Sequence, residues 1–148
     1  MFIQWDDGYL VGHTLIDFDH QMLINITNEL FSRVDNGFTQ EEISQTISCL
    51  NDYVNRHFER EESLFIDSEY PDTQEHIKTH REISKTVANI SALYKQDPNA
   101  INIHEVLEFL RDWLTKHILR ADQQYAPYIG VTVPSRRGAS CQAHKHAS

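Results

Sequence analysis

The chain has 148 residues, of which 40% are hydrophobic and 24% are charged, and this composition fits one domain with a single core. Its net charge of −9 at pH 7 opposes a nucleic acid or an anionic lipid surface as partner, because either would need a clustered basic surface. No apolar run is long enough to span a membrane, and the amino terminus lacks the basic and apolar regions of a secretory signal. We therefore expect a cytoplasmic protein in which Cys49 and Cys141 are free thiols.

Apolar residues spaced three and four apart predict two helices after an amino-terminal arm. The first covers residues 16–34, and the Asn36-Gly37 pair that follows can adopt the positive φ of a helix end. The second covers residues 43–64. Thr39 and Glu42 lie at the start of this helix with the spacing of a capping box, so the local sequence sets both ends of the connecting turn.

Two more helices follow, each after a proline that interrupts the pattern. Tyr70-Pro71 separates the second helix from a stripe at residues 76–94, for which Asp72 or Thr73 is the candidate cap. Asp97-Pro98 then precedes a stripe at residues 103–117. Because short connections make consecutive helices antiparallel neighbours, we predict an all-α, up-down-up-down four-helix bundle.

The carboxyl-terminal residues differ in character from the four stripes. Residues 131–148 have no apolar period and few large side chains, so they predict a disordered tail or a linker. The sequence therefore favours one functional domain at residues 1–130, followed by a flexible tail.

Five histidines and two acidic residues lie on or beside the inward stripes of the predicted helices. His57 and Glu61 are four residues apart on one helix, so their side chains are only about 40° apart and can reach one site. His76 and His80, in the third helix, are also four residues apart and can likewise reach one site. His117 and Asp122 are five apart, about 140° on a regular helix, so Asp122 must reach across or lie where the last turn loosens. The seven residues are His20, His57, Glu61, His76, His80, His117 and Asp122.

These residue types at these positions point to a metal. A charged or imidazole group on a core stripe loses hydration, which either a hydrogen-bond network or a metal ion must replace. Seven such groups on facing stripes favour the metal. If both carboxylates bridge two octahedral ions that also share an oxo or hydroxo group, the ligands fill about eleven of twelve positions. One open position favours end-on binding of a small diatomic molecule.

The motifs as a whole resemble the hemerythrin family, in particular the single-domain bacteriohemerythrins. The resemblance covers about residues 5–125, in the order of the family. The matching pieces are Trp5 and Gly12, Ile16-Asp17-x-x-His20, His57-Phe58-x-x-Glu61-Glu62, Tyr70-Pro71, His76-x-x-x-His80, and Trp113-x-x-x-His117-Ile118 with Asp122 and Tyr125.

The resemblance implies a non-haem di-iron centre that binds dioxygen reversibly, in an oxygen carrier, store or scavenger. It implies that three histidines, His76, His80 and His117, hold a saturated iron. His20 and His57 then hold the iron with the open position, and Glu61 and Asp122 bridge the two.

Activity as an enzyme is not expected, because the sequence shows neither a proton relay nor a second open position. The alternative role is an oxygen- or redox-sensing domain of a larger bacterial signalling protein, which would act through a downstream domain or a redox partner. Sequence alone does not separate these roles.

Several other side chains could surround the site. Leu23, Phe58 and Trp113 are candidates for an apolar ligand pocket, although the same residues also suit plain core packing. His13 and His104 are expected at the surface or at a helix end rather than in the site. Glu62 is expected on a solvated face of its helix, next to Glu61.

Overall fold

The computed structural model describes residues 2–117 and 121–129, and within these ranges all regular structure is helical. Four long helices form the bundle, α1 (Thr14–Asp35), α2 (Gln40–Ser68), α3 (Thr73–Gln96) and α4 (Ile103–Lys116). The four-helix prediction is therefore confirmed. The predicted tail at 131–148, including Cys141, lies outside the described residues.

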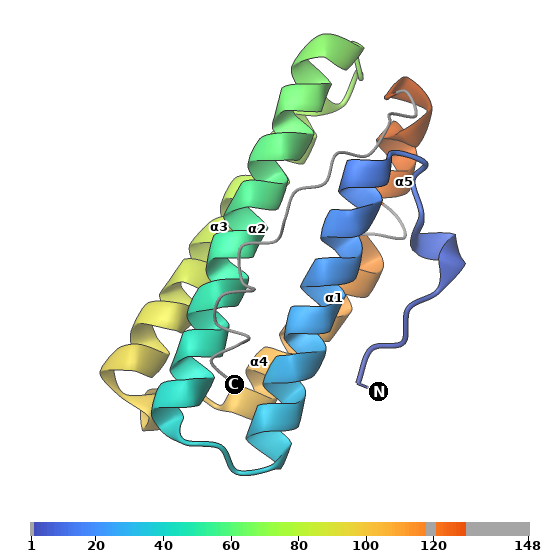
Figure 1. The fold of residues 1–148 in the computed structure, drawn as a ribbon. Coiled ribbons are helices and arrows are strands. Elements are labelled where there is room, and N and C mark those ends of the chain that lie inside the picture. The colour runs from blue at the N-terminus through green and yellow to red at the C-terminus, as the bar shows by residue number, and fades with distance from the viewer. Residues whose placement is uncertain (1, 118–120, 130–148) are drawn as a thin grey trace.

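The helices pack as antiparallel neighbours. Helix α1 contacts α2 and α4, and α2 contacts α3, with the connections alternating between the two ends of the bundle (Figure 1). A short helix, α5 (Asp122–Tyr125), lies near the start of α1 and the amino-terminal arm (Figure 1). This arrangement turns the inward stripes of all four long helices toward one interior.

Local sequence sets the turn between α1 and α2. Gly37 takes a φ of +71°, a left-handed conformation that glycine adopts without a steric cost. The Thr39 hydroxyl accepts from the Glu42 backbone N–H at 3.1 Å, and a Glu42 carboxylate oxygen accepts from the Thr39 backbone N–H at 3.1 Å. The predicted capping box is present. At the start of α3, Asp72 holds the cap position, but its side chain makes no capping hydrogen bond.

Two residues between α4 and α5 depart from the regular α-helix. His117 and Ala121, on either side of residues 118–120, have π-helical conformation. A π turn bonds residue i to residue i+5, so it brings residues five apart closer to one face than a regular helix does. The conformation of these two residues agrees with the loosened turn expected from the spacing of His117 and Asp122.

The arm is fixed to α1 by hydrogen bonds from side chains. The Asp17 carboxylate accepts from the backbone N–H groups of Val11 and Gly12 at 2.7 and 3.2 Å. Asn28 bonds both backbone groups of Ile3, at 2.7 and 2.8 Å. The arm therefore covers α1 in a fixed register, and it joins the core instead of trailing from it.

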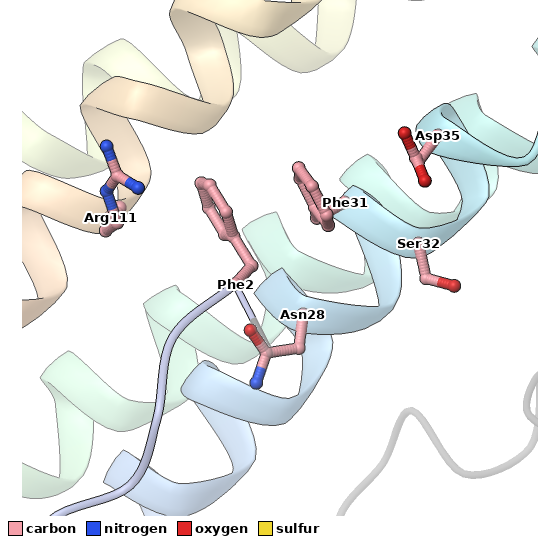
Figure 2. Close-up of a pocket in the computed structure, with 6 residues that line it drawn as sticks. All are labelled: Phe2, Asn28, Phe31, Ser32, Asp35 and Arg111. Carbon is pink, nitrogen blue, oxygen red and sulfur yellow. The ribbon is translucent and has the colours of Figure 1, made fainter.

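The tip of the arm lines a surface pocket at the far end of α1 from His20. Phe2 stacks on Phe31 with ring centroids 4.5 Å apart, and the Arg111 guanidinium lies 4.9 Å from the Phe2 ring centroid (Figure 2). Asn28, Ser32 and Asp35 complete the lining. None of the seven predicted ligands lines this pocket.

The structure tests the expectations about membrane-spanning segments and about the free thiol of Cys49. Within the described part of the chain, no helix combines the length and apolarity needed to cross a membrane. Cys49, by contrast, is in a disulfide, so the expectation of a free thiol is wrong for this residue. That expectation rested on the lack of a secretory signal, which gives no information on the bonding of a particular side chain.

The buried core has two parts, and the predicted ligands lie between them. Along α1, His20 lies between Ile16 of the smaller cluster and Leu23 of the larger one. Along α2, Glu61 lies between Phe58 of the larger cluster and Phe65 of the smaller. The polar groups are therefore enclosed by apolar packing on both sides along the bundle.

Candidate metal centre

All seven predicted ligands converge in the bundle interior. His20 comes from α1, His57 and Glu61 from α2, a pair of histidines from α3, His117 from the end of α4, and Asp122 from the start of α5. Each is buried, and the most exposed of them, His117, is 7% exposed. Each long helix therefore contributes one or two polar groups to a site from which solvent is excluded.

The ligand atoms divide into two groups that share a carboxylate. In each group the candidate atoms lie within 4.8 Å of one another, close enough to hold a single ion. One group contains three histidines and the other contains two, with Glu61 in both. The groups are Glu61, His76, His80 and His117, and His20, His57, Glu61 and Asp122.

The Glu61 carboxylate faces both groups, one oxygen to each. Its Oε1 lies 2.9 Å from the Nε2 of His80, in the three-histidine group. Its Oε2 lies 3.2 Å from the Nε2 of His57, in the two-histidine group. A carboxylate in this orientation can donate one oxygen to each of two neighbouring ions.

Asp122 has the same two-sided arrangement. Its Oδ1 lies 2.9 Å from the Nε2 of His117 and 3.2 Å from the Nε2 of His76. Its Oδ2 lies 2.7 Å from the Nε2 of His20, in the other group. Both carboxylates thus lie between the same two sets of imidazoles.

Most of these buried polar atoms lack a hydrogen bond of acceptable geometry within the described residues, although their separations are short. Each such atom costs about 1–3 kcal/mol when it is buried without a partner. A pair of cations would satisfy them together, and we conclude that the residues present fit a dinuclear metal site. The unpartnered atoms are the Nε2 of His20, His57, His76, His80 and His117, Oε1 of Glu61, and both carboxylate oxygens of Asp122.

Charge coupling within the metal-free cluster shifts its pKa values in opposite directions. Burial alone would raise the pKa of Glu61, but the charge of His57 and the short distances to the neighbouring imidazole nitrogens outweigh it, and the pKa lies well below its usual range. Burial would lower the pKa of His57, but the charge of Glu61 and a hydrogen bond to Asp19 raise it to about 10. The His57 imidazole therefore holds a proton at neutral pH, at a position where a metal would bind.

These shifts predict how the stability of the metal-free protein depends on pH. Because the folded-state pKa of His57 is raised to about 10 from an unfolded value of about 6.5, its contribution is complete below about pH 6.5 and is lost as the pH rises through about 10. The melting temperature of the metal-free protein should fall across this window, as circular dichroism melts at stepped pH can measure. A melting temperature that rises from pH 6.5 to 9 would contradict the coupling.

Two acidic residues outside the predicted set contact the Nδ1 atoms of His57 and His80, on the side of each ring that faces away from the site. Asp19, fully buried, lies 3.0 Å from the Nδ1 of His57, and Glu62 lies 3.0 Å from the Nδ1 of His80. The expectation that Glu62 faces solvent is wrong, because His80 on α3 is close enough to bond it. Asp19 was missed, although its position, three after Ile16 and four before Leu23, is a core position.

Aromatic rings surround the imidazoles. Phe58 stacks on His80 with centroids 3.8 Å apart and planes 7° apart, and Trp113 stacks on His117 at 5.5 Å. Leu23, the third predicted pocket residue, is buried in the same core cluster as Phe58 and Trp113. The predicted pocket residues are therefore near the site, and two of them contact ligand rings.

Three other side chains complete the surroundings. Tyr125, fully buried, donates its hydroxyl to Oε2 of Glu61 and so orients this carboxylate. His13 caps the start of α1, and His104 is exposed in the first turn of α4. Neither of these two histidines belongs to the candidate metal groups, in agreement with the expectation that they lie at a helix end or at the surface.

The fold and site define a class of helical-bundle proteins with a buried cation centre built from imidazoles and shared carboxylates. The chain belongs to the hemerythrin family, since the family model described as the Hemerythrin HHE cation binding domain matches residues 11–129. The match includes all seven candidate ligands.

Individual proteins agree with this membership. The chain is 31% identical to a bacteriohemerythrin of Clostridium acetobutylicum over 131 residues, covering 84% of this chain and 98% of the relative. It is 28% identical to a bacteriohemerythrin of Methylococcus capsulatus over 115 residues, covering 78% and 86%. A crystal structure of wild-type hemerythrin superposes with a TM-score of 0.79 at 25% identity, covering 86% of this chain and 98% of the other.

Proposed function

We propose that this protein binds dioxygen reversibly at a non-haem di-iron centre bridged by Glu61, Asp122 and an oxo or hydroxo group. The observation that carries the proposal is the two-sided placement of both carboxylates, each with one oxygen facing each histidine group. Neutral imidazoles with few carboxylates suit a metal that exchanges electrons with dioxygen reversibly, because they stabilise the ferric state less than a carboxylate-rich set does.

The two groups differ in histidine number, and this difference sets where a ligand can enter. We assign His76, His80 and His117 to one iron, and His20 and His57 to the other. If Glu61 and Asp122 are shared by both irons, the group with two histidines would supply one protein ligand fewer than the group with three, and dioxygen would enter on that side. An iron pair held by these residues would supply the electrons that dioxygen binding requires.

Apolar residues beside the two histidine groups keep the site dry. Leu23, Phe58 and Trp113 are buried, and none of them brings a charged group to the site. Exclusion of water and anions from such a pocket slows loss of the bound ligand and irreversible oxidation. We assign these three side chains to the dioxygen pocket.

Similarity to proteins named hemerythrin and bacteriohemerythrin supports this function for residues 1–130. We propose a carrier, store or scavenger of dioxygen in the cytoplasm, without enzymatic turnover. The remaining residues, 131–148, are proposed to be a tail outside the functional domain.

The proposal makes a prediction about metal content. Protein purified in air should contain about two irons per chain and show an oxo-to-iron charge-transfer band, because the ligand set provides two adjacent sites. Azide added to the oxidised protein should change this band by binding at the open position. Metal analysis and visible spectra test both. One zinc per chain with no visible absorption would contradict the di-iron assignment.

A further inference from the structure

A buried network behind His57 connects the two-histidine group to the edge of the bundle. One oxygen of Asp19 lies 3.0 Å from the Nδ1 of His57, on the opposite side of the ring from Glu61. Arg60 donates to both Asp19 oxygens, at 2.8 and 2.6 Å, and the Tyr53 hydroxyl donates to one of them at 2.9 Å. Four donors therefore fix one carboxylate, and that carboxylate fixes the imidazole.

A similar pair lies behind His80 but is more exposed. Glu62 accepts from both terminal guanidinium nitrogens of Arg81, at 2.8 and 2.9 Å, and lies 3.0 Å from the Nδ1 of His80. The Glu62 and Arg81 side chains are 15% and 63% exposed, whereas those of Asp19 and Arg60 are 0% and 33% exposed. Water can replace Arg81 at Glu62, but it cannot easily replace Arg60 at Asp19.

The two-histidine group depends on the Asp19 network more than the three-histidine group depends on Glu62. Within the described residues, the Nδ1 of His20 has no hydrogen-bond partner, so His20 has no comparable group behind it. His57 is then the ligand of this group whose orientation and donor strength are set by a fixed neighbour. Groups behind a ligating histidine commonly fix its tautomer and strengthen its donation to the metal.

We propose that Asp19 is the positioning residue for His57 and that Arg60, by balancing the charge of Asp19, tunes the reduction potential of the iron on the two-histidine side. This inference rests on the proposed di-iron function. Asp19 without Arg60 is an unbalanced buried negative charge next to an iron ligand, and such a charge stabilises the ferric state. Arg60 without Asp19 is an unbalanced positive charge with the opposite effect.

Opposite shifts of the potential test the proposal. In the iron-loaded full chain, Asp19→Asn should raise the reduction potential and Arg60→Gln should lower it, each corresponding to about a tenfold change in the ratio of ferric to ferrous affinity, or about 59 mV. Arg60→Lys keeps the charge and should stay close to wild type. Arg81→Gln is the matched control, since it removes the exposed counterpart, and it should have little effect.

The double variant Asp19→Asn/Arg60→Gln removes both charges, so its potential should return toward wild type. If a single variant folds poorly or binds too little iron, the potential of the double variant still tests the proposal. The melting temperature of each iron-free variant measures folding separately. Shifts in the same direction for both single variants, or equal shifts for Arg60→Gln and Arg81→Gln, would overturn the proposal. Wild-type protein without two irons would instead contradict the proposed function.

Discussion

Replacement of Glu61 or Asp122 with alanine is expected to abolish loading of two irons. Each carboxylate presents one oxygen to each histidine group, so under the proposed assignment either change would remove two metal bonds and one of the two carboxylate bridges. We expect loss of affinity for the iron pair by more than about 100-fold, beyond the effect of removing a group that only supports a ligand. Iron per chain and the visible charge-transfer band measure the result.

His104→Ala is the control for these variants. His104 is an exposed histidine on α4 and belongs to neither candidate metal group. This variant should load iron as wild type does. Normal loading in both carboxylate variants, with folding confirmed by circular dichroism, would refute the assignment of Glu61 and Asp122 as bridges.

Removal of iron from the wild-type protein is expected to lower its melting temperature by about 10 °C. Iron-free protein leaves buried imidazole nitrogens and carboxylate oxygens without suitable partners, which costs several kcal/mol, at about 1–3 kcal/mol for each group before relaxation. Iron binds the folded state and not the unfolded chain, so its binding free energy adds to stability. Thermal melts of matched iron-loaded and iron-free samples at one pH test this.

Restoration of iron to the same iron-free sample is the control for damage during chelation, and it should recover the original melting temperature. An unchanged melting temperature after complete removal would mean that the seven buried groups satisfy one another through hydrogen bonds. That outcome would support a buried hydrogen-bond network in place of a metal site.

Much of the bundle and the convergence of the seven residues followed from periodicity. A helical stripe places residues three and four apart on one face, so His57 and Glu61 had to share a face once α2 formed. The capping box at Thr39 and the glycine at the end of α1 set helix ends through contacts within a few residues. Such features depend on local sequence and can be read without the fold.

The supporting residues could not be assigned in the same way, because their partners are far away in sequence. Asp19 on α1 meets Arg60 on α2, 41 residues later, and Glu62 meets His80 after 18 residues. Contacts between polar residues of different helices depend on how the helices are rotated and how they cross. The spacing of apolar residues along one helix does not specify either. Glu62 was therefore expected in solvent, and Asp19 was passed over.

The central claim is reversible binding of dioxygen, and stopped-flow mixing of the diferrous protein with dioxygen, followed by an argon purge, tests it most directly. We predict uptake of about one dioxygen per pair of irons, and recovery of the diferrous spectrum and the full dioxygen uptake after the purge. Immediate conversion to the diferric state, with no dioxygen recovered by purging, would contradict reversible binding and would favour a redox-sensing role instead.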